Sequence, residues 1–175
     1  MSDISFRYAA GQNRRLRIAV DLGRDWVDLT ACNRPNFTTV RIKASDLCAA
    51  QRETARIHRD ASERSDHCDV TTVLVDLEAM TAEHFSAARA QLLSLGASDG
   101  VPDHSESLRY VGTPAGLAGL IGDIFVARVA DGVTVRPLSS TTLRDFCEIT
   151  LPRLRRFPLQ IDATQLRLIY PRSAA

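Results

Sequence analysis

The sequence predicts a single α/β domain, residues 1–175, in which parallel strands alternate with helices. Two observations support this fold class. Short runs of β-branched and apolar residues recur along the chain, and segments with apolar residues at helical spacing lie between them. The length of 175 residues matches one domain, and no low-complexity segment or interdomain linker divides it.

The first part of the chain is predicted to contain two helices among short strands. Leu16, Ala19 and Val20 have helical spacing after Asn13, which is a good N-cap. The expected elements are a strand over residues 4–8, a helix from Asn13 to Gly23, a strand over residues 26–30, an extended piece over residues 38–42 and a helix from Asp46 to Ala61.

The second part has the clearest signals. Residues 70–75 are largely β-branched, which is typical of a buried strand, and Thr113 with Pro114 marks a helix start. The expected elements are a strand over residues 70–75, a helix from Thr81 that buries Phe85 and stops at Gly96, a loop over residues 97–107, a helix from Pro114, a strand over residues 133–137 and a helix over residues 141–154. Strand–helix order thus occurs four times, which calls for a parallel sheet.

Composition excludes several classes of function. The formal charge is +1, so no net field favours nucleic acid or an anionic membrane. No apolar run approaches the roughly 20 residues of a membrane span, and residues 1–4 lack a signal-peptide profile. We therefore expect a soluble, cytoplasmic protein.

Metal and nucleophile motifs are absent from the sequence. The four cysteines form no C-x-x-C pair and are expected to be reduced structural thiols, with a ligand or nucleophile as the alternative. The four histidines show no metal-ligand spacing, so no metal is predicted. Asp76, expected to end its strand, could belong to a site at the carboxyl ends of the strands or simply cap the strand.

Three segments resemble, in order, the C-terminal part of the luciferase-like flavin-dependent monooxygenases. Residues 8–17, Y-A-A-G-Q-N-R-R-L-R, are similar to the family's Q-A-G-x-S-x-x-G-R loop. Residues 110–114, Y-V-G-T-P, lead through a helix to residues 131–137, D-G-V-T-V-R-P, and residues 151–156, L-P-R-L-R-R, resemble the family's P-x-L-x-x-R ending. The nearest branch acts on nitrilotriacetate, alkanesulfonates and organosulfur compounds.

The resemblance implies a TIM-type (β/α)8 barrel, but 175 residues are too few for a complete one of about 250 residues. Four strand–helix units would form the C-terminal half of the barrel. Such a half exposes strand edges, so we expect a homo-oligomer or a partner chain that supplies the N-terminal half.

In this family the first loop holds the flavin phosphate, since glycines let the backbone approach and amides at a helix N-terminus meet the anion. The resemblance implies a reduced flavin, FMN or a deazaflavin, whose phosphate contacts would be Ala10, Gly11, Gln12, Asn13 and Arg17. Ala9 and Leu16 depart from the family's glutamine and second glycine. The same segment could therefore be only a capped helix with exposed arginines.

Two functions fit these residues. The chain could be a subunit or truncated homologue of a reduced-flavin-dependent monooxygenase, supplied by a flavin reductase and contributing the phosphate-loop half of the barrel. Alternatively, it could be a degenerate, non-catalytic homologue that acts as a binding or assembly module. The family's catalytic side chains come largely from the part that this chain lacks, so we name no catalytic residue and expect the isolated chain to be inactive.

Overall fold

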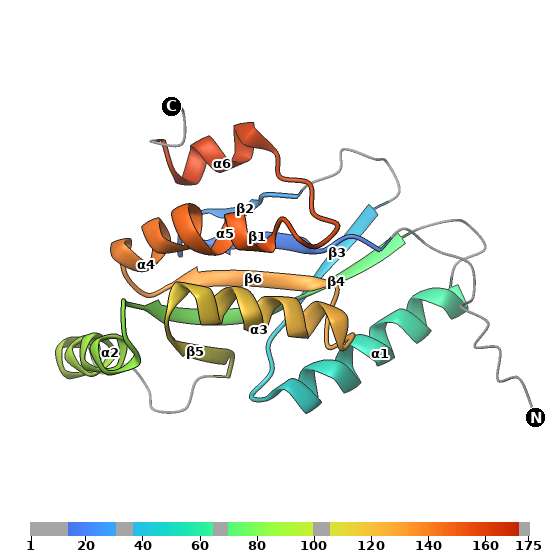
Figure 1. Cartoon of the computed structure of the whole chain (residues 1–175). Helices are drawn as coiled ribbons and strands as arrows, with labels where there is room; N and C mark the ends of the chain where they lie inside the picture. Colours follow the sequence, from blue (N-terminus) through green and yellow to red (C-terminus); the bar gives the residue numbers. More distant parts are fainter. Residues whose placement is uncertain (1–13, 31–36, 65–69, 100–105, 172–175) are drawn as a thin grey trace, which may run out of the picture.

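The computed structural model describes residues 14–30, 37–64, 70–99 and 106–171, which form one sheet with helices packed on it (Figure 1). The strands are β1 (Arg17–Asp21), β2 (Trp26–Asp28), β3 (Phe37–Ile42), β4 (Val70–Thr81), β5 (Leu108–Gly112) and β6 (Gly132–Pro137). The helices are α1 (Leu47–Arg64), α2 (Phe85–Asp99), α3 (Pro114–Val126), α4 (Ser140–Asp145), the π-helical segment η1 (Phe146–Thr150), α5 (Leu151–Leu154) and α6 (Ala163–Ile169). Among these described helices, none has the length and apolar character needed to cross a membrane.

The six strands lie in the order β2-β1-β6-β4-β3, and β5 also pairs with β4. β3 pairs with the first half of β4 and β5 with its last residues, so the two short strands flank β4 one after the other. Every pairing is parallel except that of β1 with β2. Four strand–helix units, β3–α1, β4–α2, β5–α3 and β6–α4, confirm the predicted α/β class.

The position of β6 distinguishes this sheet from a run of consecutive barrel strands. Such a run would follow chain order, whereas β6, the last strand, lies between β1 and β4. A closed parallel barrel has one comparable place, where its last strand pairs with its first. The fold is therefore a mixed α/β fold with a curled sheet that is consistent with part of a TIM-type barrel, although its strand order is not that of a simple C-terminal half.

One face of the sheet is covered by helices and forms the main core. α1 and α3 run along this face in Figure 1, and their buried residues pack against Val73, Val75 and Leu77 of β4. The start of α3 is as predicted: the Thr113 side chain accepts a hydrogen bond from the Gly116 N–H at 3.1 Å. The apolar stripe of α3 has helical spacing and is packed in the same core; its members are Leu117, Leu120, Ile121, Ile124 and Phe125.

At the start of β6 the backbone approaches β1 very closely. Gly132 is opposite Arg17, and a Cβ at Gly132 would lie 1.8 Å from the Arg17 carbonyl oxygen. Because that neighbour is backbone, no side-chain rotation could make room. Glycine is therefore required here for β6 to pair with β1.

The helix predicted from Asn13 to Gly23 is wrong where the structure describes it, because residues 17–21 form β1. Leu16, Ile18 and Val20 alternate as they would in a strand, and the same stretch also matches a helical spacing. β1 lies inside the sheet, and residues 16–20 are buried on both of its sides, so their burial does not alternate although their side chains do. The strand predicted over residues 4–8 lies outside the described residues.

Three further expectations need correction. β4 continues to Thr81, so Asp76 lies inside the strand rather than at its end. α2 begins at Phe85, which is 59% exposed instead of buried, and Gly96 lies within this helix. β5 was not expected, because its five residues follow a polar stretch, and among the described strands it pairs with β4 alone.

Candidate functional site

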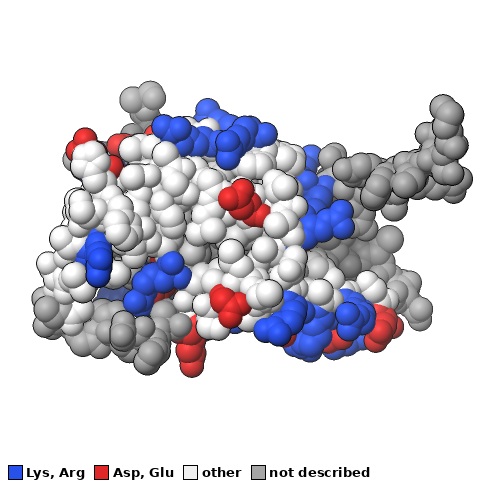
Figure 2. Space-filling view, turned by 60° about the horizontal axis from the view of Figure 1, so that its bottom comes forward, with Lys and Arg blue, Asp and Glu red and all other residues white. Residues whose placement is uncertain are grey.

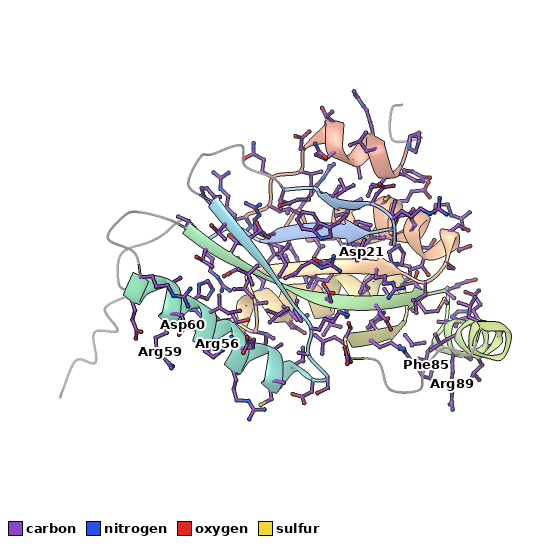
Figure 3. All side chains as sticks on the ribbon, turned by 180° about the vertical axis from the view of Figure 1, so that it is seen from behind. Asp21, Arg56, Arg59, Asp60, Phe85 and Arg89 are labelled. Atoms are coloured by element: carbon purple, nitrogen blue, oxygen red, sulfur yellow. The ribbon has the colours of Figure 1, made fainter. Side chains whose placement is uncertain are left out.

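The second face of the sheet, which we call the concave face, carries most of its charged side chains. On β1, β4 and β6 alternate residues such as Ile18, Val75 and Val133 enter the main core, so the residues between them point to the opposite side. The concave-face residues include Arg17, Ala19, Asp21, Trp26, Asp28, Arg41, Leu74, Asp76, Glu78, Arg109, Thr134 and Arg136. Figure 3 views the molecule from the side opposite to Figure 1, where this face lies toward the reader, and labels Asp21 on it.

An ion pair across the sheet demonstrates the curl. Arg41 on β3 contacts Asp21 on β1 at 2.5 Å, although β4 and β6 lie between these strands. In a flat sheet three strand spacings would separate them by roughly 14 Å. The edges of the sheet therefore bend toward each other on this side, and Arg41 bridges β3 and β1.

Arg41 is fixed by two carboxylates. Its Nε and Nη2 donate to Asp76 at 2.7 and 2.9 Å, in addition to the contact with Asp21. Hydrogen bonding to Asp76, and then to Asp21, raises the pKa of Arg41 in spite of burial. Burial opposes ionisation of Asp21, but the Gly23 N–H and Arg41 outweigh it and hold the pKa of Asp21 below its ordinary value.

Near the carboxyl ends of the strands, charges of opposite sign alternate along one row. Glu78 is in register with Arg136 on one side and with Arg109 on the other. Arg109 contacts Glu78 at 2.9 Å and Arg136 contacts it at 3.5 Å. Asp21 continues the row beyond Arg136, so the order across β1, β6, β4 and β5 is acid, base, acid, base. Parallel α/β sheets bind ligands at this end of their strands.

α2 closes the concave face just beyond this row. Met80 and Val111, each the next concave-side residue on its strand, form a small second core with Leu138, just after β6, and with Ala88 of α2. Leu92 and Leu95 of α2 pack against the same cluster. The concave face therefore ends in an apolar cluster, with the charged row beside it.

At the opposite end, Arg17 lies deep in the concave face. Its Nη2 donates to Asp28 at 2.7 Å, and both side chains are at least nine-tenths buried. The Arg17 Nε is also buried but has no hydrogen-bond partner within the described part of the chain. Arg17 therefore retains one donor that a ligand could use.

The sequence-predicted phosphate residues are only partly placed. Ala10, Gly11, Gln12 and Asn13 lie outside the described residues. Arg17 begins β1, so the helix N-terminus expected to supply amides next to it is a strand instead. It also lies four residues before Asp21, about 13 Å from the charged row. The proposed phosphate contacts thus stay a prediction, with Arg17 at the amino end of the sheet.

A second polar cluster holds the amino end together. Asp131 accepts hydrogen bonds from the Val73 N–H at 2.8 Å and from Arg14 at 3.3 Å, and His58 Nε2 lies 2.8 Å from it. Arg14 also donates to the carbonyls of Phe125 and Ala130, both at 2.9 Å. These contacts fasten β1, β4, β6 and α3 together, so Arg14 has a structural role.

The remaining chemistry-bearing side chains carry no site. Within the described ranges no group of three or more His, Cys, Asp or Glu residues could hold a metal ion. Cys48 and Cys147 are free, and burial raises the pKa of Cys147 to about 12, so its thiol is unreactive. The charges on α1 form exposed pairs, such as Arg56 with Glu53. Figure 2 shows blue and red side chains side by side at the lower right, where α1 lies.

With this geometry in place, comparison with solved structures gives consistent matches. DmoA from Hyphomicrobium sulfonivorans has a TM-score of 0.55 and 14% identity over 67% of this chain and 37% of that one. A long-chain alkane monooxygenase (LadA) has a TM-score of 0.56 and 16% identity, over 78% of this chain and 41% of that one. The EDTA monooxygenase EmoA from Chelativorans sp. BNC1 has a TM-score of 0.53 and 15% identity, over 75% of this chain and 43% of that one.

The likeness is one of fold. The chain spans about two fifths of the length of these structures. No protein-family model and no curated protein matches the chain. The fold likeness agrees with the resemblance expected from residues 110–114, 131–137 and 151–156, which form the β5–α3 junction, β6 and the α5 region.

Most of the concave-face residues were not singled out from the sequence. Asp76 was considered a possible site residue, whereas Asp21, Arg41, Glu78, Arg109 and Arg136 were not. A signal was present, because each lies inside or next to a strand at a position where an apolar residue would be ordinary. Their mutual proximity could not be inferred without the strand order.

Proposed function

We propose that this chain is a subunit or truncated homologue of a reduced-flavin-dependent monooxygenase. The observation that supports this most is the curled, largely parallel sheet whose concave face has its polar row at the carboxyl ends of the strands. The resemblance in sequence and the fold likeness to two structures named as monooxygenases point in the same direction.

The residues present are compatible with a flavin. Arg17 offers a buried Nε without a partner, and Arg136 is more than half exposed beside the charged row. A phosphate or a ring carbonyl could accept hydrogen bonds from either guanidinium. When bound, reduced flavin would supply the electrons for oxygen activation. This chain's own residues would bind and orient it.

The partner is part of the proposal. This chain spans only about two fifths of the length of its structural neighbours. A partner chain, or a second copy of this chain, would supply the rest of the barrel. A flavin reductase would then provide the reduced cofactor. Sedimentation at micromolar protein concentration tests the assembly, and a stable monomer would contradict the homo-oligomer.

A non-catalytic binding or assembly module is the second candidate. One observation favours it: the arginines of the concave face are all engaged by carboxylates of the same face. Such a network can stabilise the curled sheet without any ligand.

Equilibrium dialysis against FMN and riboflavin distinguishes the two candidates. The monooxygenase proposal predicts weak but measurable binding, with a few-fold preference for FMN because only FMN carries a phosphate. Arg17→Gln and Gly11→Val should each abolish the preference, while Arg15→Gln, an exposed neighbour that contacts Gln160, should not. Absence of binding for both flavins, with or without a partner chain, would support the non-catalytic module.

A further inference from the structure

The only tryptophan of the chain lies on the concave face, next to the charged row. Trp26 on β2 is in register with Asp21, and its side chain is on the same side of the sheet. It is 40% exposed, although tryptophan is usually well buried. An exposed indole at the carboxyl end of a parallel sheet is therefore available to a ligand.

The indole is held in one orientation. Its Nε1 lies 3.4 Å from the Thr134 Oγ1 on β6 and donates to it. Thr134 is in register with Ala19, so the ring crosses β1 and covers the small side chain of Ala19. This arrangement fixes the ring plane before a ligand arrives, which lowers the entropic cost of stacking.

A cation with free donors lies beside this ring. Arg136 follows Thr134 on β6 by two residues, so it points to the same face one step nearer the carboxyl end. It is 56% exposed, and its described contact is a single long one, 3.5 Å from Nη1 to the Glu78 Oε1. A guanidinium has five N–H donors, so most of them remain for a ligand.

Three carboxylates of this region are less exposed than Arg136. Asp21, Asp76 and Glu78 have only 10–17% of their side chains exposed, and all three contact arginines of the same face. Arg41 contacts both Asp21 and Asp76 and balances their negative charge. A ligand at the rim thus meets an aromatic plane and an adjacent guanidinium before it reaches any of these three carboxylates.

We propose that Trp26 and Arg136 form the contact for the ring system of the flavin: the indole stacks on the ring, and Arg136 donates to its carbonyl-bearing edge. This inference rests on the proposed function and assigns the ring end of the same ligand. A flat heteroaromatic ring stacks on tryptophan, and a cation at its carbonyl edge favours the reduced, more electron-rich state. It is independent of the phosphate contacts proposed for Gly11 and Arg17.

The test uses lumiflavin, which has the flavin ring without ribityl chain or phosphate. Because the chain has one tryptophan, its emission reports on this position alone. Lumiflavin and FMN are expected to quench that emission along the same isotherm that equilibrium dialysis gives. Trp26→Ala should weaken lumiflavin binding about tenfold, whereas Trp26→Phe, which keeps an aromatic ring, should weaken it less than about threefold.

Arg136→Gln separates the charge from the stacking. It should weaken reduced FMN about tenfold more than oxidised FMN, which lowers the midpoint potential of the bound flavin by about 30 mV. Arg56→Gln is the matched control, because Arg56 is 57% exposed on α1, away from the concave face, and should leave both values unchanged.

The outcomes distinguish this inference from the function on which it rests. If dialysis shows flavin binding but Trp26 emission and the affinity of Trp26→Ala are unchanged, the ring contact lies elsewhere and the proposed function stands. If no flavin binds at about millimolar concentration, both are overturned. Circular dichroism establishes that each variant is folded, and quenching of the unaltered protein needs no variant at all.

Discussion

Alternate residues of β4 serve the two faces of the sheet. Val73, Val75 and Leu77 point into the core beneath the helices, whereas Asp76 and Glu78 point to the concave face. The helix-packed face is stabilised by removing apolar surface from water, a term that is nearly independent of pH and salt. The concave face is stabilised by ion pairs whose strength depends on both pH and salt. The stability contributed by the helix-packed face should therefore change little with pH and salt, whereas that of the concave face should depend on both. The following substitutions test this contrast.

The largest effect is expected on the helix-packed face. Leu77→Ala removes a fully buried side chain and should lower the free energy of unfolding by about 2–5 kcal/mol. Urea unfolding measures this loss. Leu93→Ala on α2, where the leucine is 64% exposed, is the control and should have almost no effect. Similar losses in both variants would mean that α2 buries Leu93 against something else.

The next effect concerns the joint between β1 and β6. Gly132→Ala places a Cβ against the Arg17 carbonyl and should cost about 1–3 kcal/mol or more, since the backbone must move. Gly119→Ala is the matched control, because its Cβ would meet nothing within 4 Å in α3. There the helix should gain about 0.5–1 kcal/mol. Thermal unfolding of the two variants should therefore shift in opposite directions.

A moderate effect is expected on the concave face. Arg41→Met leaves Asp21 and Asp76 facing each other without their shared cation. We expect a loss of roughly 1–2 kcal/mol, discounted because Arg41 is partly exposed to solvent. Unlike the loss in Leu77→Ala, it should shrink in 1 M salt. A salt-independent loss would show that Arg41 acts through packing alone.

The smallest effect appears only as a pH dependence. The folded pKa of Asp21 is depressed, so its contribution is present above the unfolded pKa of about 3.9 and is lost as pH falls through the folded value. Asp21→Asn should therefore lose less stability than the unaltered protein on acidification below about pH 4. Urea unfolding at pH 7 and pH 3 measures the difference, and equal acid sensitivity would contradict the assignment.

The two faces also differ in how well the sequence predicts them. The β-branched run from Val70 and the stripe along α3 correctly predict a buried strand and a core helix, because burial on the helix-packed face leaves a local pattern. The segment with Leu16 and Val20 is misread, since five successive buried residues satisfy helical and strand spacing equally.

The concave face leaves almost no local pattern. Arg41 and Asp76 are 35 residues apart, and Arg41 and Asp21 are 20 apart, so only the strand order brings them together. That order depends on β6 pairing with both β1 and β4, a nonlocal choice that periodicity does not encode. The charged row therefore could not be assembled from the sequence, although each of its members stands out in its own strand.

The insertion of β6 between β1 and β4 has a consequence for the order in which the chain can fold. Until residue 132 has left the ribosome, the strands that precede it form two separate pieces, the β1–β2 hairpin and the β3–β4–β5 group, with no hydrogen-bonded strand between them. β6 then joins both pieces at once, and the ion pair between Arg41 and Asp21 can form only afterwards. During synthesis, residues 132–137 thus decide whether the strands that precede them become one sheet.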